Sequence, residues 1–175
     1  MKTYPVELNL ADRPVLIVGG GEVAARRAEV LVAAGATIRV VSLSFVPELE
    51  QLPVERVVAA YTPEAIGVAR LVFACTDDPL LNARIAADTR AAGALCNIAD
   101  DPESSDFVMP AVLRRGSLTL AVGTAGASPL LAARIRDELE SQFGPDSGIL
   151  VDELQWARRI IRQQVSDPAA RRNIH

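Results

Sequence analysis

Three consecutive glycines stand between an apolar run and a stretch of strong helix formers. Residues 15–18 are continuously apolar, as in a strand buried on both faces, and the helical stretch 22–34 follows at once. Gly19, Gly21 and Ala24 fit the pattern G-x-G-x-x-A, which allows a tight turn, a close phosphate approach and close helix packing. The helix would direct free N–H groups at a pyrophosphate. The sequence therefore predicts a dinucleotide site; the alternative is a glycine-rich turn without a ligand.

The end of the next expected strand, residues 37–42, lacks a feature that NAD-binding folds usually have. An Asp or Glu normally stands there, about 20 residues after the turn, and holds the ribose hydroxyls. Here the chain has Ser42, Leu43 and Ser44, and no arginine is present for a 2′-phosphate. The two serines could hold the ribose, so this feature leaves NAD and NADP undecided.

Polar residues follow two further expected strands, at the edge of a parallel sheet where ligands bind. Thr76 is expected to line the cofactor cleft, and Asp78 to cap the next helix. Asp100 ends the last parallel strand and is the candidate general base, which would take a proton while hydride passes to a nicotinamide. Its alternative role is that of a loop-capping aspartate. The single histidine, His175, is terminal, so we expect neither a histidine-based nucleophile nor a bound metal.

The elements that must position these residues alternate along the chain. Strands are predicted at 54–60, 71–74 and 94–99 as well, helices at 45–51 and 79–91, and a short edge strand at 4–10. This alternation predicts an α/β fold, a Rossmann-type parallel sheet with helices on both faces. We expect it to form an NAD-binding domain over residues 1–105.

The pattern changes after residue 105. Residues 107–113 and 117–122 predict a β-hairpin, and the helices expected next cover 130–142, capped by Ser128, and 149–165. We expect a dimerisation region at 106–145 and a C-terminal helical segment at 146–175. These parts are too small for a core of their own, so a second subunit is expected to complete it.

Composition excludes several classes of protein. Of 18 basic residues only Lys2 is a lysine, which argues against Schiff-base chemistry, and a pI near 5.1 argues against nucleic acid as a partner. No apolar run is long enough for a membrane span and no signal peptide is evident, so a cytoplasmic protein is expected. Cys75 and Cys96 lie in apolar runs and are interpreted as small buried residues. Arginine pairs such as Arg158 and Arg159 could grip a polyanion or simply be solvated.

Five stretches resemble, in order and spacing, the precorrin-2 dehydrogenase family, which includes the dehydrogenase/ferrochelatase module of siroheme synthase. They are residues 15–24, 74–78, 96–100, 107–111 and 121–129, within a likeness that covers about residues 3–143. The resemblance implies NAD-dependent oxidation of precorrin-2 to sirohydrochlorin in siroheme biosynthesis. In some members it also implies insertion of ferrous iron as a second substrate.

The resemblance further implies roles for particular residues. The family's essential aspartate falls on Asp100, and its cofactor contacts fall on the glycine turn, including Glu22 and Val23, and on Leu43 and Ser44. It implies a homodimer interlocked through the hairpin and the following helices, and a substrate rich in carboxylates, which the arginines would suit. Two alternatives stay open: a dehydrogenase of another anionic substrate, and a non-catalytic sensor of a dinucleotide or tetrapyrrole.

Overall fold

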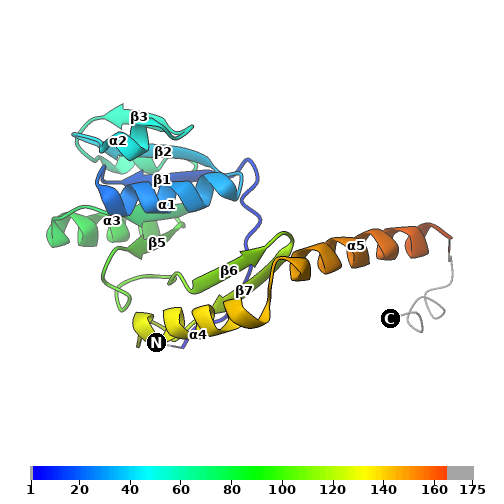
Figure 1. Cartoon of the computed structure of the whole chain (residues 1–175). Coiled ribbons are helices and arrows are strands. Elements are labelled where there is room, and N and C mark those ends of the chain that lie inside the picture. The colour runs from blue at the N-terminus through cyan, green and yellow to red at the C-terminus, as the bar shows by residue number, and fades with distance from the viewer. Residues whose placement is uncertain (1, 165–175) are drawn as a thin grey trace. The chain divides into compact units, whose positions relative to one another are not determined.

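The computed structural model describes residues 2–164 (Figure 1). The chain divides into two compact units, and the boundary along the sequence lies between Val108 and Met109. The last residue of the expected C-terminal helix, Val165, and the lone histidine, His175, lie outside the described residues. Within the described range no helix is both long and apolar enough to cross a membrane.

The first unit is built on a five-stranded sheet whose strands all run parallel. Its strands are β1 (Pro14–Val18), β2 (Thr37–Ser42), β3 (Glu55–Val58), β4 (Leu71–Ala74) and β5 (Leu95–Ile98), in the spatial order β3-β2-β1-β4-β5. The predicted Rossmann-type sheet is therefore confirmed. Because β1 pairs with both β2 and β4, the strand order reverses beside β1, which makes the carboxyl end of β1 the topological switch point.

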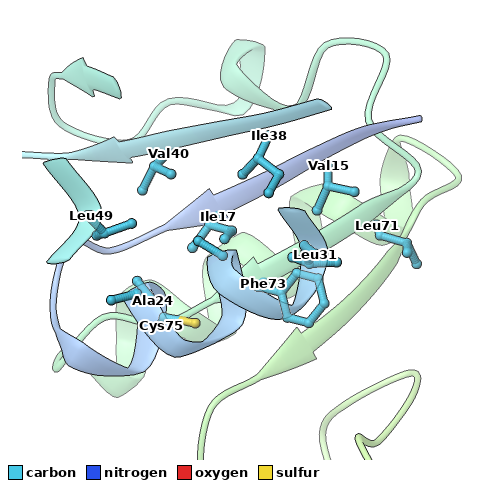
Figure 2. Close-up of a cluster of buried hydrophobic side chains, with 12 residues drawn as sticks. Val15, Ile17, Ala24, Leu31, Ile38, Val40, Leu49, Leu71, Phe73 and Cys75 are labelled. Atoms are coloured by element: carbon cyan, nitrogen blue, oxygen red, sulfur yellow. The ribbon is translucent and has the colours of Figure 1, made fainter. Parts of the chain in front are cut away.

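Helices cover both faces of this sheet, so the unit has two apolar layers. The helices are α1 (Glu22–Ala33), α2 (Pro47–Glu50), the 3-10 helix η1 (Pro63–Ile66) and α3 (Pro79–Ala91). Side chains of α1 and α2 pack with Ile17 and Phe73 on one face (Figure 2). Those of η1 and α3 pack with Val72 on the other. Strand β4, buried throughout, is the continuous apolar run that a doubly covered strand requires.

Three sequence expectations need correction in this unit. Residues 4–10 form no strand, and Tyr4 is 87% exposed, because no neighbouring strand pairs with the alternating pattern. The helix expected at 45–51 is shortened to α2, because Pro47 fixes its first turn and holds Val46 in an extended conformation. The strand expected at 54–60 covers only β3.

The second unit consists of a β-hairpin and two helices. Strands β6 (Ala111–Arg115) and β7 (Leu118–Val122) are antiparallel, and helices α4 (Pro129–Gln142) and α5 (Asp146–Gln164) follow. The hairpin begins later than expected, directly after Pro110, and α5 begins earlier, at Asp146. The Ser128 side chain caps α4 by accepting a hydrogen bond from the Leu131 N–H, as predicted.

Candidate functional site

The glycine turn lies at the switch point and is packed against the end of β4. Gly19 is buried with φ +119°, and a Cβ there would lie 2.3 Å from the carbonyl oxygen of Cys75. Its N–H donates to the carbonyl of Val41, at 2.9 Å. Only glycine accommodates both this backbone conformation and this close approach.

Gly20, which the sequence pattern leaves unspecified, is held at least as tightly. A Cβ at this position would lie 1.9 Å from the Ser44 carbonyl oxygen and 2.8 Å from Oγ of Ser42. The Gly20 carbonyl in turn accepts a hydrogen bond from the Val46 N–H, at 2.9 Å. The middle glycine thus fixes the turn to the segment after β2, and the triple glycine itself was the only sequence signal for this role.

Gly21 differs from both because it faces open space. A Cβ added to it would meet no atom within 4 Å, and its backbone is extended, with φ −88°. It is the N-cap of α1, and no side chain of residues 2–164 caps this helix. The first-turn N–H groups, including those of Glu22 and Val23, have no intrahelical acceptor. A helix start that is uncapped, open and positive in its dipole suits an anion, so these residues fit a dinucleotide pyrophosphate.

The segment after β2 borders the glycine turn. Leu43 is 73% exposed and Ser44 is also exposed, whereas Ser42 is half-buried. The Ser44 backbone lies against Gly20, as described above. Leu43 and Ser44 are therefore beside the turn and open to solvent. In this position they can contact the adenosine part of a dinucleotide.

Thr76 is bound into the loop that follows β4. Its hydroxyl donates to Oδ1 of Asn82 at 2.7 Å, and Nδ2 of Asn82 donates to the Thr76 carbonyl at 2.9 Å. Asp78 accepts hydrogen bonds from the Leu80 and Leu81 N–H groups and caps α3 as expected. Since the Thr76 hydroxyl hydrogen is taken, this side chain can only accept from a ligand. Asn82, buried within the first turns of α3, was missed by sequence reasoning.

Asp100 follows β5 at the same carboxyl edge of the sheet. It is exposed and has φ +63°, a left-handed conformation that Asp tolerates better than most residues. Its neighbour Asp101 accepts a hydrogen bond from the Ser104 N–H at 3.0 Å, and hydrogen bonding by Ser104 lowers the pKa of Asp101. Among the described residues none hydrogen-bonds to the Asp100 carboxylate. The loop thus uses Asp101 for structure and leaves Asp100 open for chemistry.

The loop that carries Asp100 is fastened along the edge of β5. Oγ of Ser105 accepts from the Ile98 N–H at 2.8 Å and donates to the Asp101 carbonyl at 2.7 Å. The Asp106 carboxylate accepts from the Cys96 N–H at 2.9 Å and from Nε of Arg90 at 2.8 Å. These side chains occupy the positions where a further strand would hydrogen-bond to β5. The loop that carries Asp100 is therefore held firmly at this edge of the sheet. The sequence indicated only a polar loop here.

The two cysteines and the clustering of metal-ligating side chains can be judged within residues 2–164. Burial raises the pKa of Cys75 to about 12 and that of Cys96 to about 11, so both thiols stay protonated near neutral pH. In the part of the chain that the structure describes, no group of three or more metal-ligating side chains comes together.

Comparison with known proteins identifies the family of the chain. The family model described as "Putative NAD(P)-binding" matches residues 6–111, more than half of the chain. The chain belongs to this NAD(P)-binding family. A second model, described as "Sirohaem biosynthesis protein central", matches residues 115–142.

Individual relatives extend over both units. The siroheme synthase of Chromobacterium violaceum is 39% identical over 176 residues, which cover 98% of this chain and 37% of that protein. The siroheme synthase of Escherichia coli is 34% identical over 98% of this chain and 38% of its own length. The chain thus spans little more than a third of these relatives. A solved structure named "SirC, precorrin-2 dehydrogenase" aligns with a TM-score of 0.82 and 27% identity, over 98% of this chain and 86% of that one.

Proposed function

We propose that this protein is an NAD-dependent dehydrogenase that oxidises precorrin-2 to sirohydrochlorin in siroheme biosynthesis. The observation that carries the proposal is one sheet edge with an open, uncapped helix start at Gly21 and an unbonded carboxylate at Asp100. The likeness to a precorrin-2 dehydrogenase over both units supports the choice of substrate. The siroheme synthase relatives support the same pathway.

The residues have separate tasks in this proposal. The backbone of Gly21, Glu22 and Val23 holds the pyrophosphate, while Leu43 and Ser44 border the adenosine. Bound NAD supplies the acceptor for the hydride that leaves the substrate. When two hydrogens are removed from the substrate, one leaves as a hydride and the other leaves as a proton. Asp100 receives that proton and releases it to solvent, to which its side chain is open.

Iron insertion is a second candidate activity for the same carboxylate. Metal entry into a tetrapyrrole displaces two pyrrole protons, which an open aspartate can accept in turn. Ferrous iron would be a substrate in that reaction and not a resident metal. The siroheme synthase names of the relatives favour testing it in the same assay.

The proposal includes a homodimer formed through the second unit. Helix α5 begins against the hairpin, where Gly148 lies so close to Arg115 that a Cβ would come within 2.4 Å of its carbonyl. Further along α5, Leu150 and Leu154 are 56% and 60% exposed on one stripe. A second copy of the chain is the occupant that would bury this stripe symmetrically. Sedimentation of the wild-type chain and an L154E variant tests this: a dimer that L154E dissociates is expected, and a wild-type monomer would refute it.

The deciding experiment is an anaerobic assay with precorrin-2 generated in place, the purified protein and NAD, with and without ferrous iron. Sirohydrochlorin absorbance that develops only with NAD is expected. Siroheme formed faster than the spontaneous rate would add the chelatase. If NAD binds but no sirohydrochlorin forms, the substrate assignment fails in favour of another anionic substrate or a sensor.

A further inference from the structure

Arg27 occupies an unusual place on α1. The helix packs Ala24, Ala28 and Leu31 into the apolar layer, and Arg27 lies on the same side, three residues after Ala24 and four before Leu31. Arg27 is half-buried as a result. Its neighbour Arg26 points away, is 68% exposed at its side chain and lies 3.9 Å from Glu22.

The Nε of the Arg27 guanidinium lacks a protein partner among the described residues. Its Nε is fully enclosed and makes no hydrogen bond within the described chain. No carboxylate of the described residues comes within 4.0 Å of its nitrogens, unlike those of Arg26, Arg39 and Arg90. A donor enclosed in this way costs free energy unless something completes its hydrogen bonding. Sequences keep such unfavourable arrangements mainly where function requires them.

The surroundings of Cys75 show which side of the sheet edge Arg27 faces. Burial is the main cause of the raised pKa of this thiol; the positive charge of Arg27 offsets part of the rise and the negative charge of Asp100 adds to it. Both charges therefore act on one sulfur, at the carboxyl end of β4. Cys75 belongs to the apolar cluster beneath α1 (Figure 2), and its carbonyl borders Gly19. Arg27 and Asp100 thus both act on Cys75, the residue whose carbonyl borders the glycine turn.

We propose that Arg27 is a substrate-binding residue that holds a carboxylate of the tetrapyrrole, an inference that rests on the proposed function. Its planar fork matches a carboxylate in two-pronged geometry. The cofactor pyrophosphate is the other anion to consider, but its place is at the first-turn N–H groups of α1. Arg27 lies five residues after Glu22, about 7 Å further along the helix axis. Its charge, like that of Asp100, acts on the thiol of Cys75. The substrate side of the site is therefore the better match.

The test compares R27Q with R26Q, a change of the adjacent, solvent-exposed arginine. Sirohydrochlorin binding is measured by fluorescence titration without turnover, NAD binding by calorimetry, and the KM for precorrin-2 by the anaerobic assay. We expect R27Q to weaken sirohydrochlorin binding and raise KM about ten- to a hundredfold, with NAD affinity unchanged. We expect R26Q to match the wild type, and R27K to recover part of the loss because it keeps the charge.

Thermal unfolding separates binding from structure. R27Q should melt at the wild-type temperature or above it, because it removes a half-buried guanidinium whose enclosed Nε has no partner among the described residues. A lower melting temperature with unchanged sirohydrochlorin binding would overturn the inference, as would weaker NAD binding alone, which would place Arg27 at the pyrophosphate. If the wild-type chain itself binds no sirohydrochlorin, the proposed function fails and the role of Arg27 with it.

Discussion

Asp106 pairs with Cys96 as a residue of a neighbouring strand would, although it belongs to a loop. Its carboxylate accepts from the Cys96 N–H at 2.9 Å, and its own N–H donates to the Cys96 carbonyl at 2.8 Å. One residue thus satisfies both backbone groups of Cys96 at the open edge of β5. The loop between β5 and Asp106 carries Asp100, so this pairing anchors one side of the candidate base.

Replacing Asp106 by alanine should lower the free energy of unfolding by about 1–3 kcal/mol. The change removes the acceptor of a buried N–H group together with the partner of Arg90. D106N is the matched control: its amide oxygen can still accept from Cys96, so it should lose less than D106A. Urea unfolding of the three proteins measures the difference. Equal stability of D106A and the wild type would show that the carboxylate does not hold the edge of β5.

Replacing Asp100 by asparagine should reduce dehydrogenation at least about a hundredfold and leave NAD affinity unchanged. Asparagine has nearly the same shape and tolerates the left-handed backbone at φ +63°, so the loop should keep its conformation. D101N is the control, since its side chain can still accept from the Ser104 N–H and it should retain turnover. Steady-state kinetics with precorrin-2 compare the two. Wild-type turnover in D100N would exclude Asp100 as the base.

The sequence sufficed for the sheet because each buried strand carries its own signal. Residues 71–74 are wholly apolar, and a strand covered on both faces needs no more than this. The cap at Asp78 was likewise predictable, because an N-cap depends on residues within one turn. The strand expected at 4–10 failed for the opposite reason: alternation forms a strand only where a partner strand exists.

Long-range pairing explains what the sequence did not disclose about the site. Gly20 is constrained by Ser44, far along the chain, and Asp106 matters through Cys96 and Arg90. An arginine at position 27 is ordinary for a helix, so only the enclosure of its Nε shows that it differs from Arg26. Each of these relationships depends on how separate segments meet, which no local pattern records.

The three glycines of the turn should respond differently to substitution, and Gly21→Asp is the informative change. Asp is a favoured N-cap and the Gly21 backbone is extended, so G21D should fold with unchanged or slightly higher stability. Its carboxylate would occupy the pyrophosphate position, and NAD affinity should fall at least a hundredfold. Calorimetric titration with NAD and urea unfolding without it measure the two effects.

Gly20→Ala serves as the contrasting variant. Its Cβ would overlap the Ser44 carbonyl, so G20A should lose about 2 kcal/mol or more of stability even without cofactor. NAD affinity retained in G21D would refute the phosphate placement, whereas full stability of G20A would refute the tight packing of the turn on the segment after β2.

The two cysteines should be unreactive in the folded protein and should make it less stable at alkaline pH. Burial raises their pKa values from 9.0 to about 12 for Cys75 and about 11 for Cys96, so at pH 8 a disulfide reagent should label both thiols quickly only in urea. In the unfolded chain the thiols ionise near pH 9. Their contribution to stability is therefore complete below that pH and is lost as the pH rises through the folded values of about 11 and 12.

A C75A/C96A variant isolates this contribution, because Tyr61, whose pKa burial and Asp88 also raise, acts in the same direction at high pH. The free energy of unfolding between pH 8 and pH 11 should fall less steeply in the double variant than in the wild type. Equal slopes, or rapid labelling of both thiols in the folded wild-type protein at pH 8, would show that Cys75 after β4 and Cys96 in β5 are open to solvent. For Cys75, this would mean that the apolar layer beneath α1 does not exclude solvent from the residue against which Gly19 packs.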